Sequence, residues 1–383
     1  MSMKRPAPIR TDASNPFAHD TMIRRVPATI QDIMDRNPDY SETICRALEN
    51  LSRSIQHNER IALLSSFAPD FTDWQPAFET RQNETWLNTE WFFAETYFYR
   101  QVIECIRWWE TGRDPFTPNK IEEYQSRALM QLVEVALMDT RPAAVRLGES
   151  IARALWGNRI DLSFAASREH GTQANAEDLI ADDNASTVTQ LLDGKGAVHF
   201  INDNAGSELA MDLALVDTLL DGIVDELVLH LKMHPTFVSD ALVKDVWMFL
   251  DILMERGGNF AVFADRLRSA IHAGRLRLMP NLFWNSSHFL WDAPAHLLNG
   301  FKGARLVIVK GDANYRRIVG DALWPADTPF ADVMAYFPAP LLALRTLKSD
   351  PIVGLPSGMA QQLDTVDKNW RVNGRRGVIQ FKG

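Results

Sequence analysis

The chain has 383 residues, more than one hydrophobic core usually occupies, so the sequence allows one large domain or a main domain with an added layer. Hydrophobic residues make up 46% of the chain and charged residues 23%, which excludes a mostly disordered protein. The net charge of -9 provides no basic field for a polyanion, which argues against nucleic acid or an anionic membrane as the main partner.

The cysteines and the apolar stretches point to a cytoplasmic protein. Cys45 and Cys105 are far apart and make a disulfide framework implausible, so a reducing cytosol is the simplest compartment. The segment 1–18 has no apolar run and is expected to be a flexible tail. The most apolar stretch, Trp86 to Trp109, is interrupted by five charged residues that a bilayer interior would penalise, which predicts a buried helix.

Residues 19–190 are predicted to be a helical N-terminal portion, because apolar residues recur there at spacings of three and four. The expected helices are Asp20 to Arg36, Ser41 to His57, Thr89 to Glu110, Lys120 to Met138 and Pro142 to Trp156. The polar, acidic stretch from His170 to Ser186 is expected to be a loop or a connection.

Residues 191–383 alternate short β-branched runs with amphipathic stretches. The expected strands are Ala197 to Ile201, Glu226 to Leu231, Arg275 to Met279, Leu306 to Lys310, Leu341 to Thr346 and Val378 to Phe381. This alternation predicts an α/β fold in which a mainly parallel sheet carries helices on both faces, a three-layer α/β/α arrangement. The helical N-terminal portion is expected to pack on it as a cap or second layer.

The first polar motif directly follows the first of these strands. Asp203 and Asn204 lie between that strand and a predicted helix from Ser207 to Leu220, at the edge of the sheet where open α/β proteins bind ligands. Their oxygens suit Mg²⁺ or Mn²⁺ better than zinc. The alternative is that either residue merely caps the helix.

The second motif follows the strand Glu226 to Leu231. Asp240 could complete a metal site with Asp203 and Asn204, or it could cap the next helix, as Ser239 could. His230 and His234 do not converge on one ion at a strand spacing of four, so structural roles are favoured for them.

The third motif is the end of an apolar strand at Lys310, followed by Gly311, Asp312, Asn314 and Arg316. A lysine, a glycine and a helix start that carries Asn and Arg predict an anion cradle, because buried charge is rarely kept without a partner. Helix capping is the alternative.

Lys348 and one N-terminal helix complete the candidates. Lys348 shares a strand face with Thr346, and a solvated strand end is the simple interpretation when it is taken alone. The helix that carries Glu95 and Arg100 is expected to be mostly core, with a lid over the site as the lesser alternative.

Taken together and in order, these motifs resemble the metal-dependent damage-control phosphatase family, in the subfamily of the acidic-residue methyltransferase-like proteins. The matching segments are Asn202 to Leu209, Pro235 to Asp240, Lys310 to Arg316, Gly320-Asp321 and Arg345 to Lys348. The likeness extends over most of the chain and includes Phe17-Ala18 and Trp91 to Arg100 in the helical portion.

The resemblance implies an α/β/α domain, a divalent metal such as Mn²⁺, Ni²⁺ or Co²⁺, with Mg²⁺ possible, and hydrolysis of small sugar phosphates of the fructose phosphate type. By motif it implies that Asp203, Asn204 and Asp240 are metal ligands. The substrate-binding group that it implies is Asp312, Asn314, Tyr315, Arg316 and Lys348, and Lys310 joins it through the predicted anion cradle. Asp203, Asn204 and Lys348 are the expected catalytic residues.

Three questions remain open at this point. A water molecule is preferred as the nucleophile, since the motifs contain no Cys or His nucleophile, with a covalent role for Asp203 as the alternative. The competing activity is an adenosylmethionine-dependent carboxyl methyltransferase, which usually needs a glycine-rich turn, whereas this turn has one glycine. A binding or scaffold protein without turnover is the third class. The sequence carries no signal for the oligomeric state.

Overall fold

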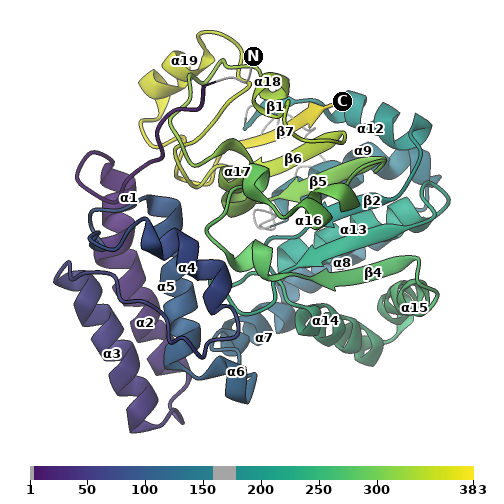
Figure 1. Ribbon diagram of the computed structural model, residues 1–383. Coiled ribbons are helices and arrows are strands. Elements are labelled where there is room, and N and C mark those ends of the chain that lie inside the picture. The colour runs from purple at the N-terminus through teal and green to yellow at the C-terminus, as the bar shows by residue number, and fades with distance from the viewer. Residues whose placement is uncertain (1–3, 158–177) are drawn as a thin grey trace.

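The computed structural model describes residues 4–157 and 178–383 (Figure 1). Its strands are β1 Leu179–Asp182, β2 Val198–Ile201, β3 Leu227–Leu231, β4 Leu276–Pro280, β5 Leu306–Lys310, β6 Leu341–Thr346 and β7 Gly377–Lys382. The helices of the first half are α1 Pro16–Asp20, η1 Thr21–Arg25, α2 Val26–Arg36, α3 Glu42–Gln56, α4 Phe71–Glu79, α5 Trp91–Cys105, α6 Trp108–Thr111, α7 Thr117–Gln125, α8 Arg127–Leu137 and α9 Ala143–Trp156. Those that follow are α12 Asn184–Asp193, α13 Ser207–Leu220, α14 Val243–Arg256, α15 Gly258–His272, η2 Leu282–Asn285, η3 Leu290–Asp292, α16 Ala295–Gly300, α17 Asp312–Val319, α18 Phe330–Val333 and α19 Met359–Val366.

The described strands form one seven-stranded sheet in the order β1-β7-β6-β5-β2-β3-β4. Every neighbouring pair is parallel except β6 and β7, which are antiparallel. The predicted fold class is confirmed: the C-terminal half is a mainly parallel α/β structure, and all six predicted strands are present.

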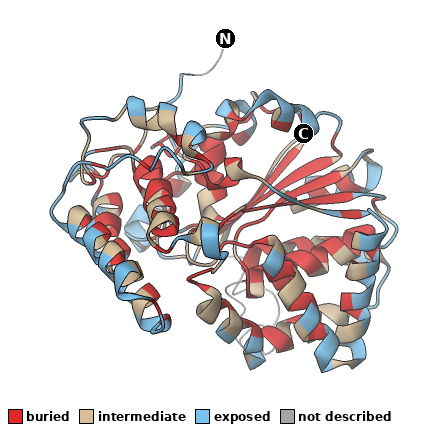
Figure 2. Cartoon of the chain, turned by 60° about the horizontal axis from the view of Figure 1, so that its bottom comes forward, coloured by how far each residue is buried: buried red, intermediate tan, exposed pale blue. Residues whose placement is uncertain are grey.

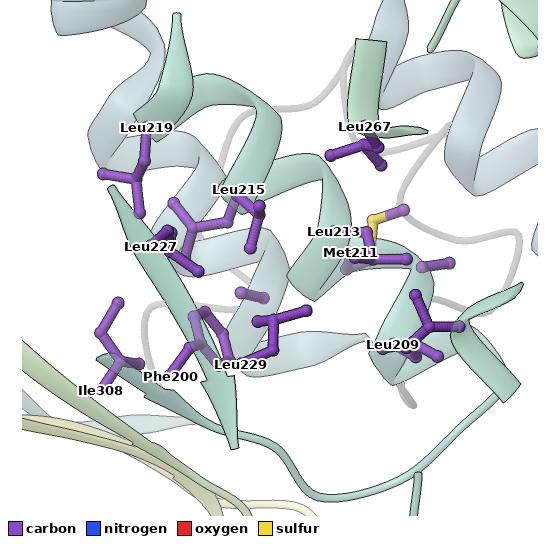
Figure 3. Close-up of a cluster of buried hydrophobic side chains, with 14 of the residues drawn as sticks. Phe200, Leu209, Met211, Leu213, Leu215, Leu219, Leu227, Leu229, Leu267 and Ile308 are labelled. Atoms are coloured by element: carbon purple, nitrogen blue, oxygen red, sulfur yellow. The ribbon is translucent and has the colours of Figure 1, made fainter. Parts of the chain in front are cut away.

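The two faces of the sheet bury separate cores, as the alternating side chains of β5 show. Leu306 and Ile308 pack on the face covered by α8, α9, α13, α14 and α15. Val307 and Val309 pack on the other face, against side chains from η2 to α19. The inner strands β2, β3, β5 and β6 are accordingly buried (Figure 2), and in the first core leucines of α13 lie against Phe200 and Leu229 of the strands (Figure 3). Period-two alternation therefore builds the three-layer sandwich.

The helical N-terminal portion divides into two groups. Side chains of η1 to α6 form a core of their own, beside the sheet (Figure 1), whereas side chains of α7, α8 and α9 belong to the first sheet core. The packing boundary thus lies between α6 and α7, near residues 112–116, and not at residue 190 as the sequence pattern indicated. Helical periodicity is the same in both groups, so it cannot tell which partner a helix packs on.

The expected connection from His170 to Ser186 is corrected where the structure describes it. Residues 170–177 lie outside the described residues, but Leu179–Asp182 is the edge strand β1 and Asn184–Asp193 is helix α12. Strand β1 pairs with β7, almost two hundred residues away in the sequence. A four-residue strand that depends on so distant a partner has no local signature.

Two of the expected helices are interrupted. Thr89 to Glu110 breaks where Arg107 adopts a left-handed conformation with φ of 55°, which separates α5 from α6. Lys120 to Met138 breaks at Ser126, whose backbone is extended and whose hydroxyl caps α8 by accepting a hydrogen bond from Leu129 N at 3.2 Å. Serine favours such caps over helix interiors.

The segment that was expected to be a flexible tail is partly fastened to the molecule. Ile9 and Thr11 are buried. The backbone N–H of Ile9 donates to the Asp321 carbonyl at 2.8 Å, and that of Thr11 donates to the Thr89 carbonyl at 2.9 Å. These contacts connect the start of the chain to the segment after α17 and to the segment before α5, so residues 9–18 are not a flexible tail.

Within residues 4–157 and 178–383, no helix combines the length and the apolar composition that crossing a bilayer requires. Cys45 and Cys105 are both free thiols, as the predicted lack of a disulfide framework implies.

Two stacked histidines in the sheet predict a pH-dependent stability. His199 Nδ1 and His230 Nε2 are 3.0 Å apart on neighbouring strands, and burial lowers the pKa of His199 to about 4 and that of His230 to about 3. The unfolded chain then binds more protons between these values and about pH 6.5. The contribution of the two neutral histidines to the free energy of unfolding is therefore fully present above pH 6.5. It decreases as the pH falls, by roughly 2 kcal/mol per imidazole at pH 5.

Urea unfolding of the protein and of His230→Phe at pH 7 and pH 5 measures this effect. We expect the loss between the two pH values to be smaller in His230→Phe. Replacement of the exposed His57 by Gln should leave the loss as it is in the parent chain. An identical loss in His230→Phe and the parent would contradict the assignment.

Candidate functional site

The candidate site lies at the point where the strand order reverses. From β2 the chain adds β3 and β4 on one side of the sheet and β5 and β6 on the other. Ile201 of β2 is in register with Val309 of β5, so the segments that follow these two parallel strands leave the sheet side by side. Open α/β sheets bind their ligands at such points. Asp203 and Gly311 are the residues placed there.

Asp203 fits against the backbone of Gly311. A Cβ built on Gly311 would lie 1.8 Å from Asp203 Oδ2, and Gly311 has φ of +83°, a conformation that glycine adopts without strain. The carboxyl group is buried, with 6% of the residue exposed. Gly311 of the third motif therefore leaves the space that the carboxyl group of Asp203, in the first motif, occupies.

Asn204 and Asp240 form an isolated antiparallel bridge, which brings the second motif to the first. Ala241 N donates to the Asp203 carbonyl at 2.8 Å, and Ser239 Oγ donates to Asn204 Oδ1 at 2.7 Å. The three predicted metal ligands therefore come together in one place, although Asp240 follows Asp203 by 37 positions.

Glu208 is a fourth member of the site that the sequence analysis did not identify. It lies in the first turn of α13, is buried, and accepts a hydrogen bond from Asn204 Nδ2 at 2.8 Å. Asn204 Nδ2 also donates to Asp203 Oδ2 at 3.1 Å. One amide thus holds two carboxylates close together. The signal in the sequence was the pair Glu208 and Asp212, four apart on one face of a mostly apolar helix.

These acidic groups make ionisation costly for one another. Burial, together with the charges of Asp240 and Glu208, raises the pKa of Asp203 well above its ordinary value. Burial also raises the pKa of Asp240 to about 6, against the effect of Lys232. Like charges in a buried site resist ionisation unless a cation joins them.

The lysines near the site compensate its acids unequally. Lys232 Nζ lies 3.2 Å from Asp240 Oδ2, and Lys310 Nζ lies 3.1 Å from Asp212 Oδ1. Within the described part of the chain, Asp203 forms no ion pair. A buried carboxylate without a cationic partner is unfavourable, which marks Asp203 as a place for a cation from solution.

The donor set fits a hard divalent cation. Asp203 and Asp240 offer carboxylate oxygens, and Asn204 Oδ1 keeps a second lone pair beside the one that accepts from Ser239. Two buried amide oxygens close by, Asn202 Oδ1 and Asn314 Oδ1, have no hydrogen-bond partner. No three His, Cys, Asp or Glu side chains of the described residues form a metal cluster on their own, so amide oxygens or water would have to contribute ligands.

Lys348 and Asp312 lie beside the site. Asp312 Oδ1 accepts hydrogen bonds from the Lys348 backbone N–H at 2.9 Å and from Arg345 Nε at 2.8 Å. Burial alone would raise the pKa of Asp312, but the charges of Arg345 and Arg316 outweigh it and lower the pKa. The Lys348 ammonium is 46% exposed and lies 3.9 Å from Glu208 Oε1. It is the cation that can meet a ligand arriving from solvent.

Lys310 and Asn314 are committed to internal contacts. Lys310 is buried, pairs with Asp212 and donates to the Ala154 carbonyl of α9. Asn314 Nδ2 donates to the carbonyls of Asn202 and Lys310, each at 2.9 Å. These contacts connect the ends of β2 and β5, so both residues brace the site, and only the free Asn314 oxygen remains for a ligand.

Tyr315 and Arg316 also have internal partners. Tyr315 donates its hydroxyl to Gln380 at 2.9 Å and stacks on Phe330. Arg316 pairs with Asp321 at 2.7 Å and with Glu95 of α5 at 2.5 Å. Arg316 therefore connects the helical portion to the sheet, and Glu95 contacts the site region through it. Arg100 is buried and bonded to Asp70, so it is a core residue.

The amino end of α13 is already occupied. Glu123 of α7 accepts hydrogen bonds from the Ser207 N–H at 2.7 Å and from the Ser207 hydroxyl at 2.8 Å. A Cβ on Gly206 would lie 2.1 Å from this carboxylate. The glycine of the first motif thus admits a protein carboxylate to the helix terminus, a position that favours negative charge.

Gly311→Ala tests the contact between Gly311 and Asp203. We expect the unfolding free energy to fall by about 1–2 kcal/mol from the left-handed backbone and by about 1–3 kcal/mol more from the clash. Gly222→Ala is the matched control, since Gly222 has φ of +84° and open space around its Cβ position. Urea denaturation of both variants measures the difference, and equal losses would show that Asp203 does not need the space.

The chain is similar to known proteins over nearly its whole length. Residues 18–363 match the family described as "Damage-control phosphatase ARMT1-like domain". The chain is 28% identical to damage-control phosphatase ARMT1 of Danio rerio, covering 95% of this chain and 94% of that one, and 24% identical to the Homo sapiens protein, covering 99% of each. A solved structure of a DUF89 family protein from Pyrococcus horikoshii shares the fold, with a TM-score of 0.51 and 14% identity over 96% of this chain and 99% of that chain. The chain belongs to the ARMT1-like damage-control phosphatase family.

Proposed function

We propose that this protein is a metal-dependent phosphatase that hydrolyses phosphate esters of small sugars, of the fructose 1-phosphate or fructose 6-phosphate type. The observation that carries the proposal is the buried, uncompensated carboxylate of Asp203 among Asp240 and Glu208, at the ligand-binding edge of the sheet. Membership of a phosphatase family supports the reaction class. The metal and the sugar are parts of the proposal.

Asp203, Asn204 and Asp240 would hold the cation. Mn²⁺ and Mg²⁺ are candidates because all these ligands are oxygens, and the family resemblance adds Ni²⁺ and Co²⁺. A divalent cation supplies charge that polarises the phosphorus–oxygen bonds and acidifies a water molecule. It would also remove the mutual repulsion of the three acids, since each would then face positive charge.

The residues around the cation would bind and orient the substrate. The Lys348 ammonium would meet the phosphoryl group, whose charge rises as the ester bond breaks. Asp312 holds the Lys348 backbone in place and could also accept a hydrogen bond from a sugar hydroxyl. Water would add its oxygen to phosphorus, the ester bond to the sugar oxygen would break, and that oxygen would take up a proton.

Water attack fits the site better than a covalent intermediate on Asp203. Asp203 Oδ2 lies against Gly311 and accepts from Asn204, contacts that hold the carboxyl group still and suit a ligand. The methyltransferase alternative gains no support from the geometry, because Glu123 occupies the helix end that a nucleotide-like cofactor would approach.

The first prediction from this proposal concerns turnover. We expect the purified protein to release phosphate from fructose 1-phosphate or fructose 6-phosphate with Mn²⁺, Ni²⁺, Co²⁺ or Mg²⁺ and to lose this activity in chelator. A colorimetric phosphate assay measures it. Turnover that persists after chelation would contradict the role of the metal. Methyl transfer from adenosylmethionine without phosphate release would contradict the phosphatase activity and support the methyltransferase alternative.

The second prediction separates the metal ligand from the phosphate ligand. Asp203→Ala should abolish metal binding and turnover together, because it removes the charge that holds the cation. Lys348→Met should keep metal affinity and lower kcat about 10²- to 10³-fold, the usual effect of losing one electrostatic stabiliser. Calorimetric Mn²⁺ titration beside kinetics measures both.

Lys302→Met, at an exposed lysine outside the site, is the control for loss of a surface charge and should match the parent in both assays. Parent-like metal binding in Asp203→Ala, or full activity in Lys348→Met, would show that the role given to that residue is wrong.

A further inference from the structure

The loop that delivers Asp240 has an unfavourable backbone. Between β3 and α14, Phe237 has φ of 47° and Val238 has φ of 67°, two consecutive left-handed residues without a glycine. Each such residue costs roughly 1–3 kcal/mol, and a β-branched residue such as valine is a rare occupant. The loop keeps this conformation only if its surroundings hold it there.

The surroundings that hold the middle of the loop are the N-terminal helices. The Phe237 ring packs on Tyr99 of α5, with ring centroids 5.1 Å apart, and both Phe237 and Val238 lie against the core of η1 to α6. The side chains of this loop therefore belong to the helical core, although its backbone follows a strand of the sheet.

The start of the loop is held in the same way. His234 is buried, and its ring lies 6.0 Å from that of Trp108 and 5.9 Å from that of Trp109, at α6. On the other side, Asn285 Nδ2 donates to the His234 carbonyl at 2.8 Å. The loop is thus enclosed between α6 and η2.

The end of the loop is held by a buried lysine from α7. Lys120 Nζ donates to the Asp240 carbonyl at 3.0 Å, and it pairs with Asp245 at 2.7 Å and with Asp114 at 3.1 Å. Lys120 therefore fixes the backbone of Asp240, whereas Lys232 pairs with its side chain.

We propose that the N-terminal helices position Asp240, with Phe237 and Lys120 as positioning residues that keep its loop in the left-handed conformation and its backbone bridged to Asn204. Phe237 acts through packing on α5 and Lys120 through the Asp240 carbonyl. One consequence of this inference rests on the proposed function. If Asp240 binds a divalent cation, the affinity for that cation depends on helices that supply no ligand themselves. By linkage, a cation bound beside Asp240 stabilises the docking of those helices.

Phe237→Ala is the test variant, because Lys120 variants would leave Asp245 buried without its ion-pair partner. Ile55→Ala is the matched control: Ile55 is fully buried in the same helical core but lies on α3. Both variants should unfold at a lower temperature than the parent chain. Phe237→Leu, which refills the space, serves as the rescue variant.

Two measurements on the full chain separate positioning from general destabilisation. We expect Phe237→Ala to weaken calorimetric Mn²⁺ binding about 10- to 100-fold, the range for losing a group that orients a ligand, and to speed amide hydrogen exchange in residues 236–241. Ile55→Ala should change neither quantity, and Phe237→Leu should restore most of both. Parent-like exchange at residues 236–241 in Phe237→Ala, or equal effects in Ile55→Ala, would overturn the inference.

The exchange measurement also distinguishes this inference from the proposed function. If the parent chain binds none of the candidate cations, the proposed function fails. Selective loosening of residues 236–241 in Phe237→Ala would still support positioning by the helices, and unchanged exchange would still overturn it.

Discussion

The arrangement of this molecule depends on one unfavourable interaction, the close approach of the buried carboxylates of Asp203, Asp240 and Glu208. Buried carboxylates repel one another, and the neighbouring lysines offset only part of this charge. Lys232 pairs with Asp240, and Lys310 pairs with Asp212 and lies 3.9 Å from Glu208. A bound divalent cation would resolve the conflict. The edge where the sheet reverses its strand order therefore favours the binding of a cation, as the proposed metal-dependent activity requires.

Much of the remaining structure keeps these groups in place. Gly311 leaves space for the Asp203 carboxylate, Asn204 holds Asp203 and Glu208 together, and the Asp240 loop is fixed by helices of the N-terminal portion. The same portion reaches the site through Glu95, which pairs with Arg316. The helices of η1 to α6 have a core of their own, but Phe237 and Val238 of the Asp240 loop pack against that core, so these helices are part of the framework of the site.

The sequence predicted the features that local patterns encode. The six short β-branched runs that predicted strands are strands in the structure. The acidic residues that follow two of them lie at one edge of the sheet, because the carboxyl ends of parallel strands lie together. It missed β1, whose partner is the distant β7, and the division of the N-terminal helices between two cores, since both depend on tertiary contacts. Glu208 was missed because a first-turn glutamate usually serves the helix terminus. The internal partners of Tyr315 and Arg316 likewise follow from packing that no motif spells out.

The most direct test of the proposed cation site is the thermal unfolding of the full chain with and without Mn²⁺, after treatment with chelator. A ligand that binds only the folded state stabilises it by about 2.7 kcal/mol at a hundredfold excess over its Kd. The account predicts that Mn²⁺ raises the unfolding temperature of the parent chain and leaves that of Asp203→Ala unchanged. An unfolding temperature of the parent that does not rise with Mn²⁺, Ni²⁺, Co²⁺ or Mg²⁺ would contradict the account.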